Sequence, residues 1–148
     1  MDLKAQLMED LKLAMRQHDE VARDAIRLTR AAIINAEIKL QRQVTDAEVV
    51  KIISKEVDLR KEAAEELQRA GRDDLVAREL ADVAVLVRYL PERMSEAQIR
   101  DQASAVIDEM DATCLRDIGP VMHELMGHLS GRADGSLVDR IVRELLSP

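Results

Sequence analysis

The sequence GRADGSLV at residues 131–138 decides how the C-terminal part of the chain folds. Gly131 suits the left-handed backbone conformation that often ends a helix. Asp134 can accept a hydrogen bond from the backbone N–H of Ser136 or Leu137 and so cap a following helix. Beyond the cap, apolar residues recur at the spacing of one helical face: Leu137, Val138, Ile141, Val142 and Leu145. The stretch therefore predicts two helices joined by a tight turn, the second beginning just after Asp134.

Arg132 lies in this turn, beside the backbone N–H groups that begin the last helix. A cation next to a helix N-terminus can hold a phosphate or a carboxylate. An exposed arginine in a turn is also ordinary, in which case Gly131 and Asp134 only shape the turn. The candidate site for binding tRNA or a protein partner consists of residues in the turn and on the following helix: Gly131, Arg132, Asp134, Gly135, Ser136 and Arg140.

Two more helices are predicted upstream of this turn. Ser95 and Gln98 form a capping box at the start of the first. The apolar positions are Ile99, Ala103, Val106, Ile107 and Met110 in the first, and Val121, Met122, Leu125, Met126 and Leu129 in the second. Pro91 ends the preceding helix, so residues 89–95 are the best candidate linker. Residues 95–148 are therefore predicted to form a small three-helix C-terminal domain.

Residues 1–90 contain four segments with helical spacing of apolar residues. Residues that can begin or end these helices are Asp19, Thr45 with Glu48, Gly71, and Asp73 or Asp74. The first stripe is Leu3, Leu7, Leu11 and Met15, and the most regular is Val76, Leu80, Val83, Val87 and Leu90 in the fourth helix. No segment alternates as a strand does. The sequence predicts an all-α protein, with an N-terminal helical bundle at residues 1–90 followed by the C-terminal domain.

The composition narrows the possible partners. Apolar residues make up 47% of the 148 residues, but there is one Tyr and neither Phe nor Trp. This argues against the aromatic stacking surfaces of most proteins that bind single-stranded nucleic acid. The formal net charge is −7, which disfavours non-specific binding to phosphate backbones. The core must be aliphatic, and of the seven Met, four fall on predicted core faces: Met15, Met110, Met122 and Met126.

A row of arginines is the second candidate binding feature. Arg23, Arg27 and Arg30 lie on the same side of the predicted second helix. This secondary basic stripe could contact phosphate. More often such a row is a solvated flank, here paired with Asp19, Glu20 and Asp24.

The sequence contains little that predicts catalysis. His123 and His128 are five residues apart, about 140° around a helix, so they do not share a face as the zinc-binding pair of a metalloprotease helix does. Cys114 is the only cysteine and has no readable base near it. There is no glycine-rich phosphate loop and no nucleophile elbow. We expect no cofactor, no metal and no catalysis by this chain alone, although the sequence does not decide whether it is an enzyme.

No segment suggests a membrane protein or an exported one. The N-terminus has no long apolar core of the signal-peptide kind, and no apolar run approaches the length that spans a membrane. A single cysteine is compatible with the cytosol. We therefore expect a cytoplasmic protein without membrane partners.

Several short motifs resemble the GatB/YqeY family. They are Arg27-Leu28, Ala31-Ala32-Ile33, Asn35-Ala36-Glu37-Ile38, Ala70-Gly71-Arg72-Asp73-Asp74-Leu75-Val76, Tyr89-Leu90-Pro91, and Gly131-Arg132-Ala133-Asp134-Gly135 with Leu137-Val138. They occur in the family's order along nearly the whole chain, so the chain resembles YqeY-like proteins. Two departures stand out: Leu67 replaces an aromatic residue, and the C-terminal part is acidic.

The resemblance implies an all-helical fold whose tail is similar to the C-terminal domain of the tRNA-dependent amidotransferase B subunit. In that enzyme, ammonia from glutamine amidates Glu or Asp attached to tRNA, and the tail belongs to the tRNA-contacting part. A label of carbon–nitrogen ligase with glutamine as amido-N-donor would be inherited from the family. We expect a non-catalytic module that binds tRNA or a tRNA-handling enzyme. The alternatives are a protein–protein adaptor with no nucleic-acid role, or a true amidotransferase component.

Overall fold

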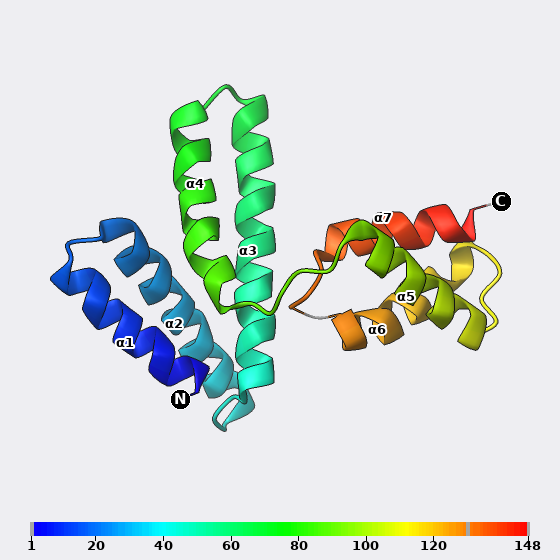
Figure 1. Cartoon of the computed structure of the whole chain (residues 1–148), viewed down its shortest axis with the longest axis horizontal. Coiled ribbons are helices and arrows are strands. Elements are labelled where there is room, and N and C mark those ends of the chain that lie inside the picture. The colour runs from blue at the N-terminus through cyan, green and yellow to red at the C-terminus, as the bar shows by residue number, and fades with distance from the viewer. Residues whose placement is uncertain (1, 130, 148) are drawn as a thin grey trace. The chain divides into compact units, whose positions relative to one another are not determined.

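The computed structural model describes residues 2–129 and 131–147, and every regular element in these residues is helical (Figure 1). The elements of the first part are α1 (Leu3–Arg16), α2 (Glu20–Leu40), α3 (Asp46–Arg69), α4 (Asp73–Leu86) and the 3₁₀ turn η1 (Val87–Tyr89). The second part contains α5 (Glu96–Glu109), the 3₁₀ turn η2 (Leu115–Asp117), α6 (Ile118–Leu129) and α7 (Gly135–Leu146). The all-α prediction is confirmed. Met1, Ser130 and Pro148, which the predicted domains include, lie outside the described residues.

The chain forms two compact units, Met1–Leu90 and Pro91–Pro148. In the first unit, α1 and α2 form one helical hairpin and α3 and α4 a second, with α2 in contact with the other three helices. In the second unit, α5, α6 and α7 contact one another pairwise. The predicted order of an N-terminal bundle followed by a C-terminal three-helix group is therefore confirmed.

Each unit has its own aliphatic core. The largest fully buried side chains of the first unit are Leu7, Ile26, Val49, Ile53, Val57 and Leu86. Those of the second are Ile99, Val121, Leu125, Leu129, Val138 and Ile141. Burial of apolar surface provides most of the favourable free energy of folding in both units.

Most helix starts follow the predicted capping pattern. Asp19 accepts from the backbone N–H of Ala22, and both predicted capping boxes, at Thr45 and Ser95, have their two hydrogen bonds. The fourth helix begins at Asp73, one of the two residues predicted to open it. Arg72 occupies the N-cap position without a side-chain cap, and Asp73 lies inside the first turn, where its negative charge still favours the helix N-terminus.

Two sets of predicted core positions are wrong. Leu80 and Val87 are 49% and 36% exposed, because α4 packs against both α2 and α3 and buries Val85 and Leu86 instead. Met15 and Met110, at 49% and 40% exposed, lie in the last turn of α1 and at the C-cap of α5. They are therefore at helix ends, where the neighbouring helices cover less of the surface.

Candidate functional site

The turn between α6 and α7 begins with Gly131. Its φ is +81°, the left-handed conformation that favours glycine, as the sequence predicts. The N–H groups of Arg132 and Ala133 both donate to the carbonyl oxygen of Leu129, at 2.9 and 3.2 Å, and so close the end of α6. Ala133 is 2% exposed and anchors the turn in the core of the C-terminal unit.

Asp134 caps α7. Its carboxylate accepts a hydrogen bond of 2.9 Å from the N–H of Ser136, which is one of the two donors predicted for it. The negative charge at this end also complements the dipole of the helix. The remaining N–H groups of the first turn of α7 have no partners within the helix and can face an incoming anion.

Arg132 is exposed, and its guanidinium forms no ion pair with any residue that the structure describes. The backbone fixes its position, because its carbonyl oxygen accepts a 2.8 Å hydrogen bond from the N–H of Met94. The side chain lines a groove of about 470 Å³ together with Met94, Gln102, Ala105, Val106, Glu109, Glu124, His128 and Leu129. The cation is therefore free to meet a ligand, although two carboxylates share its groove.

Arg140 has different surroundings from Arg132. Its guanidinium lies 3.2 Å from a carboxylate oxygen of Glu96 on α5. The same oxygen is 3.6 Å from Arg100, which also pairs with Glu144 at 2.8 Å. The hydrogen bond from Arg100 holds the pKa of Glu144 below its usual value. Arg140 thus belongs to a charged network between α5 and α7 that already balances much of its charge.

The arginines of α2 share a side of the helix but not an environment. Arg23 pairs with Asp24 at 2.9 Å, and Arg27 has a sulfur contact of 3.9 Å with Met15. Arg30 is half-buried beside a small cavity of about 220 Å³, lined also by Lys4, Leu7, Ile33, Ile34 and Glu37. The three side chains therefore do not form a uniform surface for phosphates.

Two of the residues considered for metal or nucleophilic chemistry, His128 and Cys114, each contact a nearby carboxylate. His128 lies 3.2 Å from Glu124, one turn earlier on α6. Asp117 accepts from the backbone N–H groups of Thr113 and Cys114, which lower its pKa, and so holds the η2 turn. Among the residues that the structure describes, no group of three or more His, Cys, Asp or Glu could hold a metal ion.

The structure also has a cleft between α2 and α4, which the sequence did not indicate. Its lining includes Leu28, Arg78 and Ala81. Leu28 is 55% exposed, on a side of α2 away from the buried face of Ala22, Ala25 and Thr29. A large apolar residue outside the predicted core face was the available signal, but its neighbours on α4 depend on the tertiary packing.

The comparison with known families agrees with the order of the motifs and with the fold. The family model described as Yqey-like protein matches residues 4–146. This chain belongs to the YqeY-like family. The match includes all seven α-helices of the described residues except the first residue of α1, so both units belong to the family architecture.

The YqeY-like chain is similar to fungal proteins named altered inheritance of mitochondria protein 41, mitochondrial. It is 32% identical to that of Pyrenophora tritici-repentis over 143 residues, 95% of this chain and 78% of the relative. With the proteins of Lachancea thermotolerans and Saccharomyces cerevisiae it shares 32% and 33% identity, over 74% and 70% of this chain and 60% and 58% of theirs.

The names of these relatives place them in mitochondria, so the cytoplasmic location expected from the sequence stays a prediction. Within residues 2–129 and 131–147, no helix has both the length and the apolar character needed to cross a bilayer.

Proposed function

We propose that this YqeY-like chain is a non-catalytic helical module whose C-terminal unit binds tRNA or an enzyme that handles tRNA. The observation that carries the proposal is the exposed Arg132, two residues before the Asp134 cap of α7 and without an ion pair among the described residues. The partner class comes from the resemblance of the tail to the tRNA-contacting part of the amidotransferase B subunit.

The chemistry of the turn suits a phosphate. A guanidinium offers two parallel N–H donors to phosphate oxygens, and the first turn of a helix adds backbone N–H groups and a positive dipole end. Arg132 would therefore bind the phosphate, and the N–H groups after Gly135 would orient it. Arg140 would contribute less, because Glu96 shares its charge.

The inherited label of carbon–nitrogen ligase with glutamine as amido-N-donor is not part of the proposal as an activity of this chain. The purified protein is expected to release no ammonia from glutamine. Release above the level of a boiled sample would instead favour the reading as an amidotransferase component.

A gel-shift titration with bulk tRNA at low and at moderate salt tests the proposal. We expect binding at low salt that weakens several-fold in Arg132→Ala, because a phosphate contact is lost. Arg69→Ala is the matched control, since Arg69 is a largely exposed arginine at the end of α3. The proposal fails if tRNA does not bind at low salt, or if both variants bind as the parent protein does.

An adaptor that binds only protein is the second candidate. It is favoured by the net charge of −7 and by Glu109 and Glu124, which line the groove of Arg132 and repel phosphates. A protein that stays bound through nuclease treatment, and that Arg132→Ala releases, would select this candidate.

A further inference from the structure

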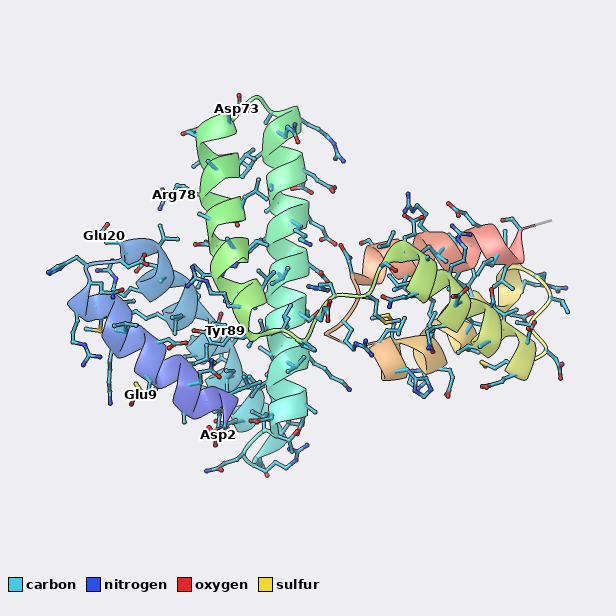
Figure 2. All side chains as sticks on the ribbon, in the orientation of Figure 1. Asp2, Glu9, Glu20, Asp73, Arg78 and Tyr89 are labelled. Carbon is cyan, nitrogen blue, oxygen red and sulfur yellow. The ribbon has the colours of Figure 1, made fainter. Side chains whose placement is uncertain are left out.

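The two helical hairpins of the N-terminal unit leave a cleft between α2 and α4. Figure 1 shows these helices approaching each other near the C-terminal end of α4 and separating toward the N-terminal end of α4. The cleft has a volume of about 830 Å³ and is lined by Glu20, Val21, Asp24, Arg27, Leu28, Ala77, Arg78, Ala81 and Asp82. Figure 2 shows Glu20 and Arg78 on its opposite walls.

The cleft has an apolar part, formed by Val21 and Leu28 of α2 and by Ala77 and Ala81 of α4. Leu28 and Val21 on α2 are 55% and 45% exposed, whereas the core of the same unit is closed to solvent. The facing positions on α4, Ala77 and Ala81, have no side-chain atoms beyond Cβ to fill the space. A second helix can therefore approach closely here, as amphipathic helices do in apolar grooves.

Among the charged residues that line the cleft, Arg27, Arg78 and Glu20 form no ion pair with a described residue, so the unpaired charge is two cations against one carboxylate. Asp24 is paired with Arg23 at 2.9 Å, and Asp82 with Arg60 at 3.3 Å. Arg27 has only a contact with the Met15 sulfur, and Arg78 forms no ion pair with a described residue.

The two unpaired cations line opposite walls of the cleft, and the charges of both act on the carboxylate of Asp24. The pKa of Asp24 is lowered chiefly by its hydrogen bond from Arg23, and also by the charges of Arg27 and Arg78. A ligand that adds carboxylates at this point would complement the charge that is left.

We propose that this cleft docks an amphipathic helix of a partner protein. The apolar stripe of that helix covers Leu28 and the alanines of α4, and its flanking Asp or Glu side chains pair with Arg27 and Arg78. A nucleic acid is a poorer fit, because the exposed Leu28 and Val21 on the wall offer no hydrogen-bond donors to a phosphate backbone. The proposal uses the N-terminal unit alone and is independent of the tRNA proposal.

A displayed library of helical peptides of about 18 residues, long enough to form a helix, tests the docking site. The peptides are selected on the full chain and counter-selected on Ala81→Trp, which fills the cleft. We expect enriched peptides with an apolar stripe at helical spacing, flanked by Asp or Glu. Failure to enrich peptides that discriminate between the two proteins, or enrichment of peptides rich in Lys and Arg, would overturn the proposal.

Fluorescence anisotropy with an enriched peptide measures how much each cleft residue contributes to the binding affinity. Leu28→Glu is expected to weaken binding about tenfold or more, and Arg78→Glu about threefold. Both positions are exposed, so circular dichroism should show unchanged helix content.

Arg69→Glu and Ala5→Trp, at exposed positions outside the cleft, are the matched controls and should bind normally. Equal weakening in the controls overturns the proposal. So does a loss of tRNA binding rather than peptide binding in Arg78→Glu.

Discussion

The hydroxyl of Tyr89, which is labelled in Figure 2, donates a 2.5 Å hydrogen bond to a carboxylate oxygen of Asp10 and so joins the end of the N-terminal unit to α1. Tyr89 is 8% exposed, and it is the only aromatic residue of the chain. Removal of its hydroxyl in Tyr89→Phe is expected to lower the free energy of unfolding by about 1–2 kcal/mol, because a hydrogen bond to a charged acceptor is lost. Urea denaturation of both proteins measures this change in the free energy of unfolding. An unchanged urea midpoint in Tyr89→Phe would contradict the prediction.

The same pair predicts a loss of stability in alkali. Burial, and then the hydrogen bond to Asp10, raise the pKa of Tyr89 above its ordinary value of 10.0. The folded state thus holds this proton more tightly than the unfolded state, so the contribution is complete below pH 10 and is lost above it. The melting temperature of the parent protein should fall more steeply above pH 10 than that of Tyr89→Phe. Parallel curves would show that Tyr89 plays no part.

The pKa of Glu48 is expected to lie far below the ordinary value of a glutamate side chain. Hydrogen bonds from Arg42, and then from the backbone N–H of Thr45, lower its pKa from 4.5 to about 2. The stabilising effect is therefore present above pH 4.5 and disappears as the pH falls through about 2. A carboxyl ¹³C titration should place the Glu48 midpoint near pH 2 and show it rise toward 4.5 in Arg42→Ala. A parent midpoint near 4.5 would refute the ion pair.

Two residues at helix ends have a left-handed backbone conformation, and substitutions at them should change the stability of the protein in opposite directions. Gln41, the C-cap of α2, has a φ of +55°, which is unfavourable for a residue with Cβ. Gln41→Gly should stabilise the protein by about 0.5–1 kcal/mol, and Gly131→Ala should destabilise it by about 1–2 kcal/mol. Urea denaturation with both variants checks the signs, and the same sign for both would contradict the explanation.

Local signals explain why the helix ends were predictable from the sequence. The capping boxes at Thr45 and Ser95, the Asp134 cap and the left-handed Gly131 each depend on residues within one turn. A stretch of four to eight residues is therefore enough to predict where each of these helices begins or ends. The family motifs also spread over both units, so the fold class did not depend on any one of them.

Features that involve two helices were not predictable in the same way. The exposed position of Leu80 follows from where α2 and α3 cover α4, which no stripe on α4 reveals. Likewise, the partner of Arg140 is 44 residues away, at Glu96, so the sequence around Arg140 could not show that its charge is already paired. The cleft beside Leu28 also needs the facing alanines of α4.

The difference between Arg132 and Arg140 leads to a test of the tRNA proposal by salt dependence. Each phosphate contact adds about 0.7–0.9 to the slope of log affinity against log salt concentration. Arg132→Ala should reduce that slope by about 1, whereas Arg140→Ala should change it less, because Glu96 already pairs with Arg140.

Glu96→Gln is expected to have the opposite effect on tRNA binding. It keeps the shape of the side chain but removes the charge that balances Arg140, so tRNA binding should become tighter and its salt slope steeper. Filter binding at four salt concentrations measures all three variants. A larger loss of slope in Arg140→Ala than in Arg132→Ala, or weaker binding in Glu96→Gln, would show that the phosphate does not lie at the start of α7.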